Sequence, residues 1–249
     1  MGQQVEFLIC GTQKGGTTAL HGYLQRHPQL YLPNQKELHY FDDEALSWEN
    51  PDYDIYHQHF AKAKSEQQLW GEATPIYMYW NSSPARIWQY NPQIKLIAVL
   101  RNPITRAFSH WNMERQRNAD SLGFLEAITT ETDRCRSALP LQHRVYSYVD
   151  RGFYSQQLRR LWSFFPRKQL LVLRQEELQL QPELTLAKVY QHLGVANLPF
   201  GGAQQRHALP YEEPMPATAK DWLRQQFQHE IQQLETILGW DCNDWLATP

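Results

Sequence analysis

The stretch FLICGTQKGGTTAL, residues 7–20, decides the fold of this chain. It starts within a short apolar run, Val5–Cys10, that is suited to a buried parallel strand. It ends in a segment with apolar residues at helical spacing, which stops before Pro28. The glycines between them therefore lie in a strand-to-helix turn, where they allow positive φ and the close approach of an anion. Because the first N–H groups of a helix attract negative charge, the sequence predicts a phosphate-binding loop here.

The spacing of this loop separates it from the loop of the nucleotide triphosphatases. Gly11 and Gly16 have the separation found in GxxxxGK[ST], but Thr17 stands where the lysine belongs, and the lysine of this loop is Lys14. The best candidate for a following strand, residues 94–100, leads into an arginine and not into the aspartate that would hold Mg²⁺. The sequence therefore disfavours a metal-dependent kinase or triphosphatase, and we expect no metal site.

Two motifs of the chain resemble those of one enzyme family. The run GTQKGGTTAL, followed by His27-Pro28, resembles the 5′-phosphosulfate loop of the sulfotransferases that use 3′-phosphoadenosine 5′-phosphosulfate (PAPS). The run LRNPITRAFSHW, residues 100–111, is similar to the 3′-phosphate motif of that family. The resemblance covers nearly the whole chain, from Phe7 to Trp245. It implies an α/β, three-layer P-loop-like fold with a central parallel sheet flanked by helices, in a single domain over residues 1–249.

The resemblance also implies which residues bind PAPS and its product, 3′-phosphoadenosine 5′-phosphate (PAP). In the first loop they are Gln13, Lys14, Gly15, Gly16, Thr17 and Thr18. Further along the chain they are Arg101, Ser109, Tyr154 and Arg206. Lys14 would also be catalytic, because it would stabilise the charge that gathers on the bridging oxygen and the 5′-phosphate. Arg101 would hold the 3′-phosphate with a bidentate guanidinium fork, while Arg206 matches less well because Gln205 stands where relatives tend to have a lysine.

A second pattern, residues 36–42 (KELHYFD), resembles the acceptor-side motif of the heparan-type and bacterial branch of the family. In that branch the glutamate is taken as the catalytic base, so Glu37 is the first candidate. Burial beside Tyr40 and Phe41 would strengthen it as a base, although the neighbouring lysine opposes this. His39 is the alternative, because histidine titrates near neutrality and other branches use one. The plainer alternative is a solvated ion pair in a loop with a packing histidine.

The acceptor is less well defined by the sequence. Residues 68–77 are similar to the family segment G-E-x-[ST]-P-x-Y, which faces the acceptor, but Ala73 stands where relatives often carry a lysine. The specificity of the family for anionic polysaccharides therefore does not carry over. The arginines of residues 114–144 either meet an anionic acceptor or form a solvated face. Carbohydrate, lipid, small-alcohol and peptide tyrosine acceptors are all compatible with the sequence.

These features together predict an enzyme, a PAPS-dependent sulfotransferase. It would move the sulfuryl group in line to a hydroxyl or amine, with Glu37 or His39 as general base and no metal. A transferring sulfuryl group carries less charge than a phosphoryl group, which makes Mg²⁺ dispensable. A non-catalytic PAP or PAPS sensor is one alternative, since it would keep both phosphate sites without a base. A metal-free kinase is another, but Arg101 and Ser109 would then have no 3′-phosphate to hold.

Composition is that of an ordinary globular protein. The chain has 249 residues, 42% hydrophobic and 20% charged, which suits one α/β domain. Its formal net charge of −2 argues against a nucleic-acid partner. It lacks a run of about 18 apolar residues and a basic, apolar secretory start, so we expect a cytoplasmic protein without a transmembrane segment. Cys10, Cys135 and Cys242 are too far apart for a disulfide framework or a zinc site.

Overall fold

The computed structural model describes residues 3–63, 68–202, 210–211 and 213–247. The chain forms two compact units. The first comprises Met1–Leu100 and Arg160–Arg206, and the second comprises Arg101–Arg159 and His207–Pro249. Each unit is described separately below.

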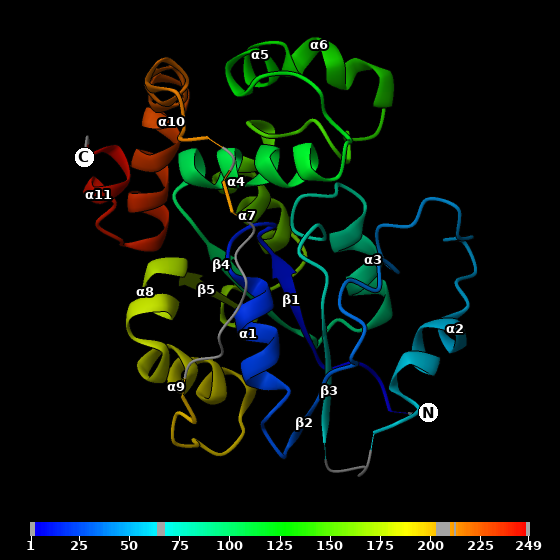
Figure 1. The fold of residues 1–249 in the computed structure, drawn as a ribbon. Helices are drawn as coiled ribbons and strands as arrows, with labels where there is room; N and C mark the ends of the chain where they lie inside the picture. Colours follow the sequence, from blue (N-terminus) through cyan, green and yellow to red (C-terminus); the bar gives the residue numbers. More distant parts are fainter. Residues whose placement is uncertain (1–2, 64–67, 203–209, 212, 248–249) are drawn as a thin grey trace. The chain divides into compact units, whose positions relative to one another are not determined.

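The first unit contains a parallel sheet of five strands (Figure 1). The strands are β1 (Phe7–Gly11), β2 (Leu30–Tyr31), β3 (Leu69–Ala73), β4 (Lys95–Leu100) and β5 (Leu170–Arg174). Their order is β2-β3-β1-β4-β5, and every neighbouring pair is parallel. The predicted α/β fold with a central parallel sheet is therefore confirmed. Strand β1 lies between β3 and β4, and all three are parallel. Their carboxyl ends therefore lie at the same end of the sheet, where open α/β sheets bind ligands.

Helices cover this sheet because its strands are apolar on both faces. On one face lie α1 (Thr17–Leu24), α8 (Gln175–Leu180) and α9 (Pro182–Leu193) (Figure 1). Phe7 and Ile9 of β1 belong to the core on that face, while Leu8 and Cys10, which point to the other face, are also fully buried. Full burial of one such large apolar side chain contributes about 1.5–3 kcal/mol. A strand that is buried on both faces is typical of an α/β layer structure.

The remaining elements of the first unit lie between β2 and β4 and before β5. They are α2 (Tyr53–His57), the 3₁₀ turn η1 (Gln58–Phe60), α3 (Ser83–Tyr90) and the 3₁₀ turn η4 (Arg167–Gln169). The start of α3 has a proline in its first positions, and the Ser82 side chain makes no cap hydrogen bond because its backbone is already helical. The Ser83 hydroxyl donates to the Phe41 carbonyl instead (3.1 Å). This bond ties α3 to residues 36–42.

The second unit is helical. Its elements are α4 (Pro103–Gln116), α5 (Phe124–Thr129), α6 (Glu131–Cys135), the 3₁₀ turns η2 (Arg136–Ala138) and η3 (Asp150–Gly152), the first part of α7 (Tyr154–Trp162), α10 (Ala217–Leu238) and α11 (Asn243–Leu246). The Asn102 side chain caps α4 by accepting a hydrogen bond from the Ile104 amide (2.9 Å). Gly239, at φ +67°, ends α10. Both helix ends follow from local sequence signals.

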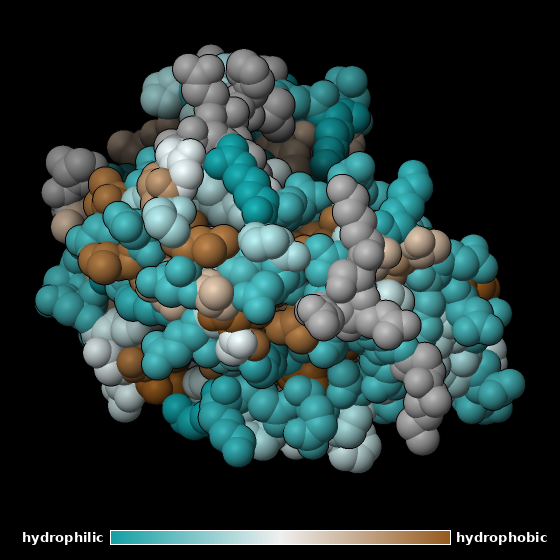
Figure 2. Space-filling model, turned by 90° about the horizontal axis from the view of Figure 1, so that it is seen from below, coloured by the Kyte–Doolittle hydropathy of each residue, from teal (hydrophilic) through white to brown (hydrophobic). Residues whose placement is uncertain are grey.

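One face of the surface is mostly hydrophilic and the cysteines form no disulfide, as is common in globular proteins. Figure 2 shows one face of the molecule, on which hydrophilic residues predominate and hydrophobic ones are scattered. Cys10, Cys135 and Cys242 are free thiols, and Cys10 is buried in the core. Within the described ranges, no helix has the length and apolar character needed to cross a membrane.

Candidate functional site

The predicted phosphate loop, Thr12–Gly16, connects β1 to α1 and is anchored to β4. The Thr12 amide donates to the Val99 carbonyl (3.1 Å), and the Gly15 amide donates to the Thr12 carbonyl (2.8 Å). These two bonds fold the loop on itself against the carboxyl end of the neighbouring strand. The loop therefore has a fixed backbone, as an anion-binding turn requires.

Backbone conformation explains the composition of this loop. Gly16 has φ +95° and Lys14 has φ +66°, a region that residues other than glycine seldom adopt. A Cβ at Gly15 would lie 2.3 Å from the Val99 carbonyl oxygen and 2.9 Å from that of Thr12. Both glycines are thus required where the sequence places them. The left-handed conformation of Lys14 had no signal in the sequence.

The start of α1 suits an anion. Gly16 is the residue before the helix and supplies no side-chain cap, and the first turn holds no acidic residue. The opening amides of a helix lack intrahelical partners, and here no acidic side chain competes with a bound anion for them. Thr17 is buried and Thr18 is exposed. The predicted residues from Gln13 to Thr18 therefore form one continuous strand–loop–helix turn.

The second predicted site segment, Lys36–Asp42, lies at the carboxyl end of β3, the strand next to β1. The Glu37 amide donates to the Ala73 carbonyl at the end of that strand (2.9 Å). Glu37 has φ +64° and His39 has φ +56°. A left-handed residue other than glycine costs about 1–2 kcal/mol, so two of them in one short segment indicate a conformation imposed by its surroundings. We call residues 36–42 the base loop.

The side chains of the base loop form a short chain of polar contacts. Lys36 Nζ forms an ion pair with Glu37 Oε1. His39 Nε2 lies 3.8 Å from Glu37 Oε2, and His39 Nδ1 lies 3.0 Å from Asp42 Oδ2. The His39 side chain is 46% exposed and that of Asp42 is fully buried. A buried carboxylate thus orients an accessible imidazole ring. Asp42 was not among the residues predicted from the sequence, although its spacing of three residues from His39 was visible there.

The expected burial of Glu37 is wrong. Its side chain is 36% exposed beside Lys36, because the rings of Tyr40 and Phe41 turn inward and are themselves buried. The buried carboxyl of this region is that of Glu72 on β3, which is 1% exposed. Burial raises the pKa of Glu72 to about 7 against the opposing effect of its hydrogen bonds.

The second unit carries the predicted 3′-phosphate residues on and before α4. Arg101 follows the last residue of β4, and its Nε donates to the Thr105 hydroxyl (3.0 Å). Ser109 lies one helical turn beyond Thr105 on the same side of α4 and is 9% exposed. Thr105 orients the guanidinium group of Arg101 and was not among the residues predicted from the sequence.

Tyr154 and Arg206 are the remaining residues predicted to bind the nucleotide. Tyr154 is fully buried, and its hydroxyl donates to the Arg101 carbonyl (2.9 Å), so it supports the backbone that carries Arg101. Arg106 is also fully buried and donates to the Tyr148 carbonyl, which is a bracing contact within the second unit. Arg206 lies outside the described residues.

Comparison with known proteins identifies the family of the chain. A family model described as a sulfotransferase domain matches residues 4–227. The chain belongs to the sulfotransferase family. This assignment agrees with the resemblance of its two phosphate motifs.

The individual relatives of this chain have low sequence identity to it. A membrane-associated sulfotransferase, kil1, from Dictyostelium discoideum is 24% identical over 94% of this chain and 65% of its own length. The human heparan sulfate glucosamine 3-O-sulfotransferase 3B1 is 30% identical over 79% of this chain and 47% of its own length. The chain thus spans between about half and two thirds of these curated relatives. A crystal structure of a sulfotransferase from Alicyclobacillus acidocaldarius is similar over 99% of this chain and all of its own, with a TM-score of 0.84 and 26% identity.

Three of the five arginines in residues 114–144 form ion pairs with acidic neighbours. Ion pairs join Arg117 to Glu114 (3.4 Å), Arg134 to Asp120 (2.8 Å) and Arg136 to Asp133 (3.3 Å). Arg115 lies over the Trp111 ring at 5.9 Å. Such pairing reduces the charge that this segment can offer to an anionic acceptor.

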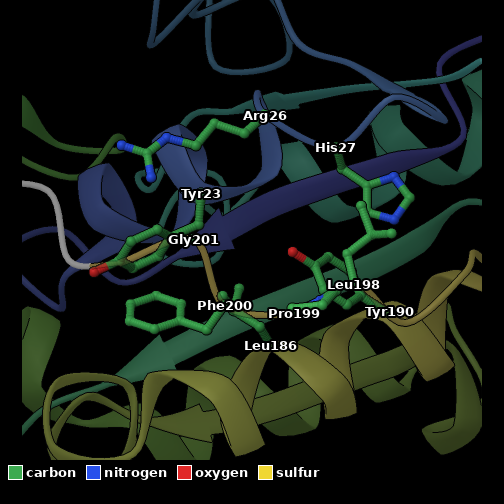
Figure 3. Close-up of a pocket in the computed structure, with 9 residues that line it drawn as sticks. All are labelled: Tyr23, Arg26, His27, Leu186, Tyr190, Leu198, Pro199, Phe200 and Gly201. Carbon is green, nitrogen blue, oxygen red and sulfur yellow. The ribbon is translucent and has the colours of Figure 1, made fainter.

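A separate pocket of about 200 Å³ lies beside the carboxyl end of α1 (Figure 3). Its lining residues are Tyr23, Arg26, His27, Leu186, Tyr190, Leu198, Pro199, Phe200 and Gly201. The His27 ring is already engaged, since Nε2 lies 2.8 Å from the Ala196 carbonyl oxygen and Nδ1 accepts from the Gln29 amide. The lining contains none of the predicted site residues. This pocket is therefore distinct from the phosphate loop at the other end of α1.

Proposed function

We propose that this chain transfers the sulfuryl group of PAPS to a hydroxyl or amine of an acceptor and releases PAP. The observation that carries the proposal is the loop Thr12–Gly16, a strand-to-helix turn that contains Lys14 and is hydrogen-bonded to β4. Membership of the sulfotransferase family supports it, since sulfotransferases use PAPS as the sulfate donor.

The nucleotide contacts in this proposal follow the two motifs. Residues Gln13 to Thr18 hold the 5′-phosphosulfate, with Lys14 placed to stabilise the charge on the departing 5′-phosphate. Arg101 and Ser109 hold the 3′-phosphate, and Thr105 keeps the guanidinium in place. That residues 1–249 form a single domain is likewise part of this proposal. Contacts of Tyr154 and Arg206 with the nucleotide stay predictions.

In the proposed reaction the acceptor oxygen or nitrogen attacks sulfur in line while the bond from sulfur to the bridging oxygen breaks. PAP leaves with that oxygen, and the acceptor proton passes to Glu37. The His39–Asp42 pair competes for this role, because a buried carboxylate holds the imidazole with Nε2 directed toward Glu37. Among the described residues, no three His, Cys, Asp or Glu side chains group closely enough to hold a metal ion.

For the acceptor we propose a carbohydrate hydroxyl as the first class to test, because a relative acts by name on heparan sulfate glucosamine. A highly sulfated polymer receives less support. Ala73 occupies the position where relatives often have a lysine, and Arg117, Arg134 and Arg136 are paired. Neutral sugars, lipid alcohols and small alcohols therefore belong in the same panel. The cytoplasmic location also stays a prediction, and one relative is membrane-associated by name.

Calorimetry with PAP, and with ATP and Mg²⁺, is the first test. We expect PAP to bind, and transfer of labelled sulfate from PAPS to a member of the panel to follow. Tight binding of ATP with Mg²⁺ and none of PAP would refute the proposal in favour of a kinase. Binding of PAP with no transfer to any acceptor, and indifferent to Glu37→Gln, would favour a sensor.

The same assay decides the base. If Glu37 is the base, Glu37→Gln lowers turnover by about 10²-fold or more, and His39→Ala has a smaller effect. A fully active Glu37→Gln together with an inactive His39→Ala would assign the proton to His39.

A further inference from the structure

Glu72 is a carboxyl group placed inside the sheet. It pairs with Leu8 in the ladder between β3 and β1, and 1% of its surface is exposed. Its Oε2 accepts a hydrogen bond from the Thr74 hydroxyl (2.7 Å), and its Oε1 accepts one from the Tyr56 hydroxyl (3.3 Å). The Tyr77 hydroxyl also hydrogen-bonds to it. Burial of a carboxyl group costs several kcal/mol unless hydrogen bonds offset the lost water, so these three hydroxyls account for its place in the core.

Two of these hydroxyls also hold the backbone of the base loop. The bonds run from the amides of His39 to Thr74 Oγ1 (3.5 Å), Tyr40 to the Tyr77 hydroxyl (3.0 Å) and Phe41 to the Tyr77 hydroxyl (3.4 Å). A hydroxyl that donates its hydrogen to a carboxylate presents its lone pairs to other donors. Glu72 therefore sets the direction in which Thr74 and Tyr77 accept the amides of the loop.

The loop needs such support because its backbone is strained. Glu37 and His39 both occupy the left-handed region, which is unfavourable for residues other than glycine. The amide of Glu37 is held by the Ala73 carbonyl (2.9 Å), and the amides that follow are held by the hydroxyls bound to Glu72. Loss of the latter bonds would let the loop relax and move both candidate bases.

We infer that Glu72 is a positioning residue, which acts through Thr74 and Tyr77 to hold the strained base loop so that Glu37 and His39 face the acceptor. The inference rests on the proposed function, since it names a residue that supports the proposed reaction without touching the substrate.

The ionised form of Glu72 is the form that positions the loop. A carboxylate accepts from all three hydroxyls, whereas a carboxylic acid brings an O–H that competes with them. The titratable groups that face Glu72 are Tyr56 of α2, Tyr77, Asp42 of the base loop and Cys10 of β1. Burial raises the pKa of Tyr56, Tyr77 and Cys10, so these three stay neutral near pH 7. The positioning effect therefore strengthens as pH rises through the pKa of Glu72, which is about 7.

Glu72→Gln tests the inference, because it keeps the shape of the side chain without the charge. At pH 8 we expect kcat to fall by about 10-fold or more, since a shift of about 1 Å in a catalytic group reduces rates by up to 10²-fold. PAP affinity should stay within about 3-fold, because the phosphate loop is unchanged. Amide hydrogen exchange in residues 36–44 should speed up. At pH 6 wild-type Glu72 is mostly protonated, so the ratio of wild-type to variant kcat should approach 1, and titration of the base itself cancels in this ratio.

Two further variants make the test specific. Tyr77→Phe removes the oxygen that accepts the Tyr40 and Phe41 amides, so it should lower kcat as Glu72→Gln does, and the double variant should lose little more. Glu131→Gln is the matched control, because Glu131 is another buried carboxyl whose pKa is raised to about 7 but it belongs to the second unit. It should leave kcat and exchange in residues 36–44 within about 2-fold.

Two results would overturn the inference. One is an unchanged kcat and unchanged exchange in Glu72→Gln at pH 8. The other is a loss of PAP affinity as large as the loss of kcat, which would indicate general damage. Exchange and PAP affinity need no turnover. A wild-type protein without transferase activity whose loop still loosens in Glu72→Gln would therefore refute the proposed function and leave the structural part of this inference intact.

Discussion

Gly15→Ala is the sharpest perturbation of the phosphate loop, and its effect follows from the geometry. The added Cβ would lie 2.3 Å from the Val99 carbonyl oxygen, a distance that real Cβ atoms do not reach. The loop must therefore retreat from β4 by about 0.7 Å to restore the 3.0 Å of a tight contact. The obstacle is backbone on both sides, Val99 on one and Thr12 on the other, so no side chain can rotate away. Gly15 does not have positive φ, and the penalty is therefore steric.

The expected magnitude is about 2–4 kcal/mol. Overpacking of a filled site costs about 1–3 kcal/mol, and the bond from the Gly15 amide to the Thr12 carbonyl adds about 1 kcal/mol when it is lost. If the loop moves away from β4 to relieve the clash, PAP affinity should fall by about 10²-fold. If the loop keeps its position, the clash destabilises the folded state, and the midpoint of thermal unfolding should fall by about 4–16 °C for a chain of this size.

Calorimetric titration with PAP and thermal unfolding together measure both outcomes. Gly123→Ala is the control, because a Cβ there meets nothing within 4 Å and the residue has φ −63°. It should leave affinity and stability unchanged. A Gly15→Ala protein that binds PAP as tightly as wild type and unfolds at the same temperature would refute the packing argument and the assignment of this loop to the nucleotide.

Three other predictions concern single side chains. Lys14→Ala should lower single-turnover sulfuryl transfer by about 10²-fold or more with thermal unfolding unchanged; near-normal rates would remove Lys14 from the mechanism. Arg101→Ala should weaken PAP binding by about 10- to 100-fold, and Thr105→Val should weaken it by only a few-fold. At saturating PAPS both variants should turn over as fast as wild type, which would show that these residues act in binding and not in the chemical step. Glu131→Gln tests stability against pH: because the folded-state pKa of Glu131 is raised to about 7, its protonated form stabilises the fold at low pH and that contribution is lost as pH rises from about 4.5 to 7. Denaturant unfolding at pH 5 and pH 8 should therefore favour the variant more at pH 8, and an identical pH dependence would contradict the burial argument.

The local signals of the sequence predicted the elements well. The apolar run before Gly11 forms β1, and the glycines that follow it form the turn into α1. The last long helix runs from Ala217 to Leu238, and Gly239 ends it in the left-handed conformation. These features are set by residues that are neighbours in the chain, so a pattern of apolar spacing, caps and glycines is enough to reveal them.

The geometry of the proposed base was not accessible in this way. Glu37 was expected to be buried beside aromatic residues, but those rings turn inward and the buried carboxyl is that of Glu72. The left-handed backbone of Glu37 was equally hidden, and the three-residue spacing of His39 and Asp42 did not by itself show that their side chains pair. The same holds for the arginines of residues 114–144, whose acidic partners decide how much charge they offer.

The sequence by itself determined the parallel α/β sheet, the glycine-rich turn after β1 and the family, because each depends on residues within one strand, turn or helix. Only the tertiary structure decided which acidic side chain is buried and which is exposed. That choice depends on groups far apart in the chain, such as the Tyr56 hydroxyl on Glu72 and the Tyr77 hydroxyl on the amide of Tyr40. Solvation and pairing of a carboxyl group are properties of its surroundings in space, and a one-dimensional pattern does not contain them.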